Sequence, residues 1–234
     1  MKNACHDYQL KTIILDGNLI KYYHLTKDVK NLRIEVGSGE IVVISPKNAS
    51  ELSFMYKHSQ WITKKYAQIC NAKNAVKSLD GQFLIFGEAF KVLPKNDFEI
   101  NFSEKTICMD QSNSTHIKKL KNELKIALYN KIKFFADGYA KKINSRYNKI
   151  TVRTQKSKWG SYSTNGNMSF NFALAFVPPE VISYIVFHEI AHSRVLRHNT
   201  QFWKIVDNEI KNRREIEKSL PGYWLFCNEI MQKL

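Results

Sequence analysis

The chain has 234 residues, of which 44% are hydrophobic, and its 36 Lys and Arg against 21 Asp and Glu produce a net charge of +15. This size and apolar content predict a globular protein with one large domain or two small ones. No run of about eighteen apolar residues occurs and the start lacks the apolar core of a secretory signal, so we expect a cytoplasmic protein without membrane partners. Four scattered cysteines without a CxxC pair predict neither a disulfide framework nor a cysteine-based zinc site.

Residues 1–112 are predicted to form a β-rich subdomain without recognisable catalytic chemistry. Apolar runs between turn signals predict strands at Thr12–Leu15, Leu19–His24, Leu32–Val36, Ile41–Ile44, Phe83–Phe86, Ala89–Leu93, Phe98–Phe102 and Thr106–Met109. Gly37-Ser38-Gly39 supplies the turn of a hairpin between the third and fourth of these strands. A helix is predicted over Ala49–Ile69, where the apolar residues follow a helical spacing.

A long amphipathic helix is predicted from Ser114 to Tyr147. Its apolar residues recur every three or four positions and form one stripe that faces a core. The surrounding segment is strongly basic, because thirteen Lys and Arg stand between His116 and Lys158 against Glu123 and Asp137. Such a field attracts polyanions, so nucleic acid is a candidate partner of segment 116–158. A solvated lysine-rich face explains the same counts equally well.

Two strands are predicted after this helix, at Ile150–Thr154 and Met168–Phe176. In the second, apolar residues alternate with smaller or polar ones, which predicts one buried face. Asn165-Gly166 supplies a tight turn before it. From its place in the chain we expect this strand to be an open sheet edge beside a cleft, where an extended peptide can add as a further strand.

The next segment, Val181–Ser193, combines an almost wholly apolar helical sequence with His188, Glu189 and His192. Pro178-Pro179 suits the start of such a helix. Unpaired burial of these groups costs on the order of several kcal/mol each, which a divalent metal would offset. Two histidines four residues apart can present ring nitrogens to one ion, while Glu189 reaches a water molecule on it. The pattern predicts zinc with Glu189 as general base; the alternative is a pair of structural core histidines.

A catalytic zinc ion needs a third protein ligand and one open position. His198 is the candidate, and its spacing from His192 requires the chain to turn back after the helix. Asn199-Thr200 suits the start of a following helix, whose positive end favours the neutral imidazole that binds metal. The alternative for His198 is a solvated loop histidine. The fallback ligands in that case are Glu209, Glu215 and Glu217.

The helix after His198 is expected to pack on the metal helix through Phe202, Trp203 and further apolar residues. We expect Phe202 and Trp203 to hold the loop that carries His198 rather than to touch substrate. Pro221-Gly222 is predicted to end this charged region, with a short closing helix over Tyr223–Gln232.

The sequence His188-Glu189-Ile190-Ala191-His192, followed by His198-Asn199-Thr200-Gln201-Phe202-Trp203, resembles the signature of the YgjP-like metal-dependent hydrolases, relatives of the SprT-like zincins. The other positions that match are Arg153, Lys158-Trp159-Gly160-Ser161, Asn171, Leu174 and Pro178. The resemblance implies an α+β fold in which residues 113–234 form a zincin-like catalytic domain with a long backing helix and a small sheet. It also implies a zinc ion held by His188, His192 and His198, with Glu189 as catalytic base.

These features together predict a zinc-dependent hydrolase, in the first place a metallopeptidase acting on a peptide or protein substrate. One alternative is a nucleic-acid-associated protease or binding protein guided by segment 116–158. Another is a metal-dependent nucleotide phosphohydrolase, because both chemistries use a Lewis acid and an activated water. The candidates for substrate or oxyanion contact are Arg153, Lys158, Tyr162 and Tyr184.

Overall fold

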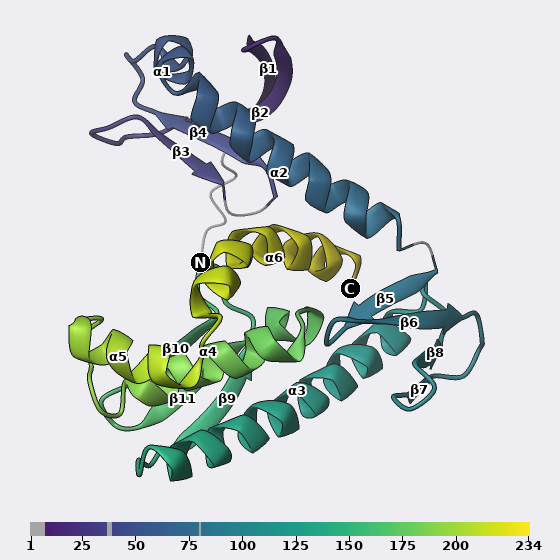
Figure 1. The fold of residues 1–234 in the computed structure, drawn as a ribbon. Coiled ribbons are helices and arrows are strands. Elements are labelled where there is room, and N and C mark those ends of the chain that lie inside the picture. The colour runs from purple at the N-terminus through teal and green to yellow at the C-terminus, as the bar shows by residue number, and fades with distance from the viewer. Residues whose placement is uncertain (1–7, 37–38, 80) are drawn as a thin grey trace. The chain divides into compact units, whose positions relative to one another are not determined.

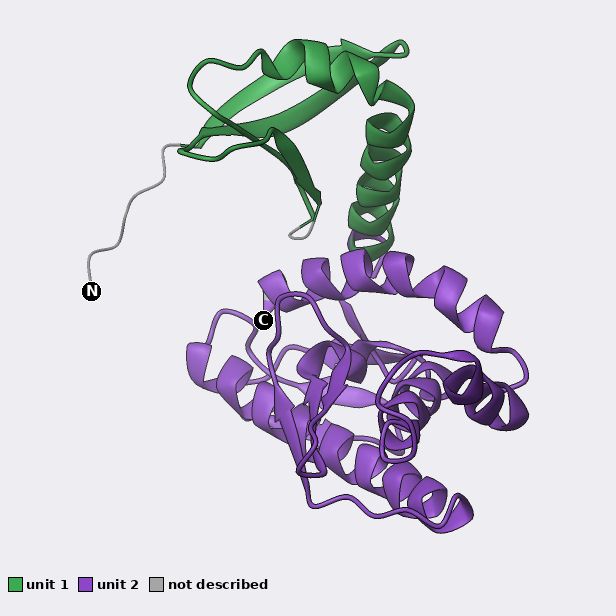
Figure 2. Ribbon diagram, turned by 90° about the vertical axis from the view of Figure 1, so that its left-hand side faces the viewer, with its two compact units in different colours: residues 1–76 green, residues 77–234 purple. Residues whose placement is uncertain are grey.

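The computed structural model of the chain describes residues 8–36, 39–79 and 81–234 (Figure 1). Contacts between residues group it into two compact units, residues 1–76 and 77–234, which Figure 2 colours separately. The predicted division after residue 112 lies inside the second unit. It stays a prediction, because a grouping by contacts does not test which part folds independently.

In the first unit, residues 8–36 and 39–76 form one four-stranded sheet and two helices. These elements are β1 (Gln9–Leu15), β2 (Asn18–Thr26), β3 (Arg33–Val36), β4 (Ile41–Ser45), α1 (Glu51–Lys57) and α2 (Ser59–Lys77), with strand order β1-β2-β4-β3. β3 and β4 pair antiparallel, which confirms the predicted hairpin, although Gly37 and Ser38 of its turn lie outside the described residues. The helix predicted over Ala49–Ile69 is instead two helices, because His58 leaves the helical conformation with φ −111° and ψ 20°.

The second unit contains two small sheets. The first holds β5 (Gln82–Ile85), β6 (Glu88–Leu93), β7 (Glu99–Asn101) and β8 (Thr106–Cys108) in the order β5-β6-β8-β7. The second holds β9 (Lys149–Arg153), β10 (Gly160–Tyr162) and β11 (Asn167–Asn171) in the order β10-β11-β9. The four strands predicted between residues 83 and 109 are therefore present, as is the strand predicted to begin at Ile150.

The strand predicted over Met168–Phe176 is wrong in its second half and in its place in the sheet. β11 ends at Asn171, and Phe172–Phe176 forms a short 3-10 helix, η1, whose five side chains are all buried. An apolar segment that is buried on every side has no single buried face, so its alternation carried no information about strand structure. Because β11 pairs with β10 on one side and β9 on the other, it offers no open edge to a peptide.

α3 (Ser114–Lys142) is the long helix of the second unit. It runs along β9 and along α4 (Pro179–Ala191), as Figure 1 shows. It ends before the predicted Tyr147 because Asn144 adopts a left-handed φ of 49°. The guanidinium of Arg194 donates hydrogen bonds to the carbonyl oxygens of Ile143 and Asn144 there. The predicted apolar stripe is buried at Leu120, Leu124, Leu128 and Ile132, and beyond them the buried residues are Ala136 and Ala140 instead of the predicted Phe135 and Tyr139.

Three further helices complete the unit: α4 (Pro179–Ala191), α5 (Thr200–Glu209) and α6 (Arg213–Lys233). The predicted helix end at Pro221-Gly222 is wrong, because both residues lie inside α6, exposed to solvent. Proline there removes one backbone hydrogen bond, but buried apolar residues on both sides hold the helix together. These residues are Ile216, Leu225, Cys227 and Ile230. The described residues thus form a mixed α and β structure with several small sheets and six α-helices.

None of the helices in the described ranges is long and apolar enough to cross a membrane.

Candidate metal centre

α4 carries two histidines and a glutamate within an apolar helix. It begins with Pro178 as N-cap and Pro179 as first residue, where a missing N–H leaves no carbonyl without a partner. His188 lies in its last turn and His192 is its C-cap residue, with ring centroids 5.2 Å apart. The four-residue spacing therefore brings both rings to the same side of the helix.

After α4 the chain turns back without glycine or proline. The N–H groups of residues 193–195 donate to carbonyls of the last turn of α4, which tightens and ends the helix. The side chain of Asn199 then accepts a hydrogen bond from the N–H of Phe202 at 3.0 Å and caps α5. His198 directly precedes this cap, so the cap and the turn together place its ring beside the end of α4.

The three histidines form one cluster. Each offers a ring nitrogen, and these ligand atoms all lie within 4.8 Å of one another. Nε2 of His188 lies 2.9 Å from Nε2 of His198. The ring of His198 has its centroid 4.9 Å from that of His188 and 4.7 Å from that of His192. Two α4 residues and one loop residue thus surround a common point.

The environment favours the neutral form of the two α4 histidines. Burial lowers the pKa of His188 to about 3, and the neighbouring histidines add to this effect. Burial also lowers the pKa of His192. Nδ1–H of His192 donates to the carbonyl of Val195 at 3.1 Å, which leaves Nε2 without a proton. Nδ1 of His188 is buried with no hydrogen-bond partner among the described residues. Neutral imidazole is the form that binds metal.

Glu189 lies between the two histidines in the chain and is only 6% exposed. Burial raises the pKa of its carboxyl group to about 7, while the positive charge of Lys158 acts in the opposite direction. The side chain packs against Gly160 of β10, which has no side chain to displace it. The carboxyl group is therefore buried against β10, on the same helical turn as His188.

A stack of side chains supports His198. The ring of Trp203 is stacked on it at a centroid distance of 5.6 Å, and the guanidinium carbon of Arg213 lies 4.3 Å from the Trp203 ring centroid. Arg213 is 9% exposed and donates hydrogen bonds to Asp207 and Glu217. Nothing in the sequence signals this role, because Arg213 stands in a run of charged residues that resembles a solvated helix face.

The four candidates for substrate contact are dispersed. Lys158 lies near enough to Glu189 to influence its pKa. The Tyr184 ring is 5.9 Å from that of His188, but its hydroxyl donates to Glu217 at 2.6 Å. Tyr162 ends β10, whereas Arg153 ends β9 at the opposite edge of the sheet. Lys158 thus acts on Glu189, Tyr184 lies beside His188, and Arg153 lies on the other edge of the sheet from Tyr162.

The fallback glutamate ligands are engaged elsewhere or exposed. Glu209 forms an ion pair with Lys142 at 2.6 Å, and Glu217 forms one with Arg213 at 2.7 Å. Glu215 is exposed in the first turn of α6. None of them belongs to the ligand cluster found among the described residues.

A family model for the YgjP-like metallopeptidase domain matches residues 30–223, most of the chain. The chain belongs to the YgjP-like family. Membership confirms the resemblance seen in the sequence motifs and supports a metal-dependent peptidase. It also implies a metal ion, and the histidine cluster of this YgjP-like protein contains suitable donor atoms.

One solved structure that the YgjP-like chain resembles is the crystal structure of the metallopeptidase zymogen abylysin from Pyrococcus abyssi. The identity is 20% and the TM-score 0.36, over 38% of this chain and 90% of that one. No curated protein matches the chain at a significant level.

Proposed function

We propose that this protein is a zinc-dependent metallopeptidase in which His188, His192 and His198 hold the ion and Glu189 is the general base. The observation that carries the proposal is the convergence of three ring nitrogens within 4.8 Å of one another. Catalytic zinc sites commonly have three protein ligands and one open position.

The donor set fits zinc. Nitrogen ligands about 2.0–2.1 Å from a tetrahedral ion lie about 3.3 Å from one another, a spacing that small side-chain movements would reach here. The closest pair of nitrogens, on His188 and His198, is 2.9 Å apart. At this distance a neutral His198 that carries its proton on Nε2 can donate to Nε2 of His188, and a metal ion bound by both rings would take the place of that proton.

Glu189 has the properties of an acid–base group. A bound zinc ion would supply an acidified water molecule and polarise the substrate carbonyl. The Glu189 carboxylate accepts the proton of the attacking water and can later deliver it to the leaving nitrogen. Its burial raises the pKa to about 7 in the metal-free protein, so both of its protonation states are accessible near neutral pH. Gly160 leaves the room that this carboxylate occupies.

β10 is the edge strand that contacts Glu189. We assign to β10 the role predicted from the sequence for residues 168–176, an open sheet edge to which an extended peptide substrate can add as a further strand. Its order in the sheet leaves one side of Gly160–Tyr162 without a partner strand among the described residues. An extended peptide can form backbone hydrogen bonds with such an edge. Pairing there would bring the peptide backbone alongside the strand that contacts Glu189.

Metal analysis and hydrolysis assays with purified variants test the proposal. We expect about one zinc ion per chain and cleavage of unfolded protein or peptide substrates. Glu189→Gln should keep the zinc and lose turnover, whereas His188→Ala should lose both. Full activity of the Gln variant would exclude Glu189 as the base. Nucleotides and nucleic acids belong in the same substrate panel, because nucleotide hydrolysis and guidance by segment 116–158 stay predictions from the sequence.

A further inference from the structure

A groove lies between α3 and β9, within the second unit. It encloses about 530 Å³ and is lined by Lys125, Ile126 and Tyr129 of α3 and by residues 150–153 of β9. A pocket of about 220 Å³ shares Lys125, Val152 and Arg153 with it, and its other lining residues include Lys121 of α3 and Met231 and Leu234 at the C-terminal end of α6. We refer to the groove and the pocket together as the α3–β9 groove.

The α3–β9 groove follows the open edge of a sheet. β9 pairs with β11 on one side, and no partner strand occupies its other side in the part of the chain that the structure describes. Consecutive residues of a strand point to opposite faces, so a groove lined by four consecutive residues of β9 runs along the edge of the strand. Such an edge presents backbone N–H and C=O groups to a binding partner.

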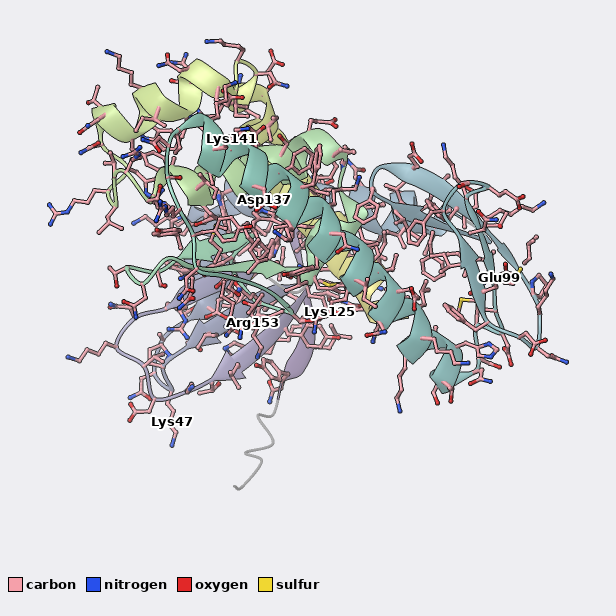
Figure 3. All side chains as sticks on the ribbon, turned by 90° about the horizontal axis from the view of Figure 1, so that it is seen from below. Lys47, Glu99, Lys125, Asp137, Lys141 and Arg153 are labelled. Atoms are coloured by element: carbon pink, nitrogen blue, oxygen red, sulfur yellow. The ribbon has the colours of Figure 1, made fainter. Side chains whose placement is uncertain are left out.

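The groove is basic and partly apolar. Lys121 and Lys125 lie one turn apart on α3, and Arg153 approaches from β9, next to Lys125 in Figure 3. No Asp or Glu is among the described residues that line it, and none of the described ion pairs involves these three cations. Ile126 and Tyr129 beside them are 48% and 39% exposed.

We propose that the α3–β9 groove binds an acidic, extended peptide segment of a partner protein, which adds to β9 as a further strand. Acidic side chains of the peptide pair with Lys121, Lys125 and Arg153, and apolar side chains cover Ile126 and Tyr129. The open strand edge favours a peptide over a nucleic acid, because backbone N–H and C=O groups match a peptide backbone and not a phosphodiester chain.

This site is distinct from the candidate metal centre. β9 and β10 are the two outer strands of the same sheet and are separated by β11, so the open edge of β9 lies about 10 Å or more from β10. The proposal does not depend on zinc or on hydrolysis. It gives Arg153, one of the sequence-based candidates for substrate contact, a role in partner binding instead.

Fluorescence anisotropy with the full-length chain tests the proposal. The probe is a labelled peptide of alternating Glu and Val, compared with a Lys–Val peptide of equal length. We expect the Glu–Val peptide to bind, and Lys125→Glu and Arg153→Glu each to weaken it about tenfold or more. Lys141→Glu is the matched control, because it makes the same charge change at an exposed lysine in the last turn of α3 and should alter binding less than about twofold. Circular dichroism spectra of the variants should match that of the parent, as a check that the variants are folded.

Three results would overturn the proposal. The first is that a Glu–Val peptide with N-methyl groups on alternate residues binds as tightly as the unmethylated peptide, since the methylated peptide cannot form a regular strand pair. The second is tighter binding of single-stranded oligothymidylate with the same sensitivity to Lys125→Glu, which would make the groove a nucleic-acid site. The third is peptide binding that His198→Ala abolishes and Lys125→Glu leaves unchanged, which would place the peptide at the metal centre. Loss of hydrolysis in His198→Ala with unchanged peptide binding supports both proposals separately.

Discussion

Gly160 of β10 and Glu189 of α4 pack directly against each other. A Cβ atom added to Gly160 would lie 2.8 Å from Oε1 and 2.9 Å from Cγ of Glu189, closer than side-chain carbons approach such atoms in proteins. Only glycine at position 160 therefore leaves the carboxyl group where it is. This contact supplies a physical reason for the glycine in the Lys158-Trp159-Gly160-Ser161 motif.

Replacement of Gly160 by alanine should lower the rate of hydrolysis with little effect on metal content. The new methyl group would push the Glu189 carboxyl group away, and a general base displaced by about 1 Å can cost on the order of 10²-fold in rate. Steady-state kinetics together with zinc analysis would measure this. Gly138→Ala is the control, because nothing lies within 4 Å of a Cβ at that helical position. It should raise stability by about 0.5–1 kcal/mol and leave the rate unchanged.

Glu189→Gln should change how the stability of the metal-free protein depends on pH. The folded pKa of Glu189 is raised from 4.5 to about 7, so the folded state binds more protons than the unfolded state between these values. Its contribution to stability therefore falls as pH rises through this interval. The Gln variant has no carboxyl group to ionise and does not lose this stability. Its free energy of unfolding relative to the parent should therefore increase by on the order of 2 kcal/mol between pH about 4.5 and 7. Urea unfolding at several pH values would measure it, and a constant difference would contradict the burial of an ionisable group.

His188 contributes to the pH dependence with the opposite sign. Its folded pKa is lowered from 6.5 to about 3, so the unfolded state binds more protons between these values and stability rises with pH across that interval. His188→Phe should flatten this rise in the metal-free protein. Unfolding curves from pH about 4 to 6.5 would show it, with His58→Phe in the first unit as a histidine control.

Arg213→Lys should weaken zinc binding although Arg213 does not touch the metal cluster. The planar guanidinium lies over Trp203 and donates to Asp207 and Glu217, and a lysine ammonium cannot do all of this. Looser support of Trp203 would leave His198 less fixed, and loss of such outer contacts typically costs about 10–100-fold in metal affinity. Competition with a zinc chelator measures the affinity. Arg214→Lys, an exposed neighbour, is the control, and equal affinities of the two variants would contradict the support of His198 by this stack.

Asn171→Ala should destabilise the protein by about 2–4 kcal/mol. Asn171 is fully buried, and its amide donates to the carbonyl oxygens of Gln155 and Lys158 at 2.9 and 2.8 Å. Its removal leaves these acceptors, and the Ala173 N–H, without their partner. Urea unfolding measures the change, with the exposed Asn167→Ala as control. A loss below about 0.5 kcal/mol would show that water replaces these hydrogen bonds.

The sequence alone determined the features that depend on local spacing. His188 and His192 share one side of α4 because four residues make about one helical turn, and the buried stripe of α3 follows from the same period. The hairpin of β3 and β4 was also predictable, because alternation and turn residues are local signals. His198 was identifiable as the third candidate from its place after His192 and before a helix start, and from the family motif, although nothing local showed how the chain turns back.

The tertiary structure alone decided which distant segments meet. Strand order made β11 central and β10 and β9 the edges, and Phe172–Phe176, which is buried on every side, forms a 3-10 helix. The support of His198 by Arg213, through Trp203, and the packing of Glu189 on Gly160 also join residues far apart in the chain. Hydrophobic periodicity reports which side of one element is buried, but it does not say what that side faces. The partners of a residue are set by the packing of whole elements, and this information became available only with the fold.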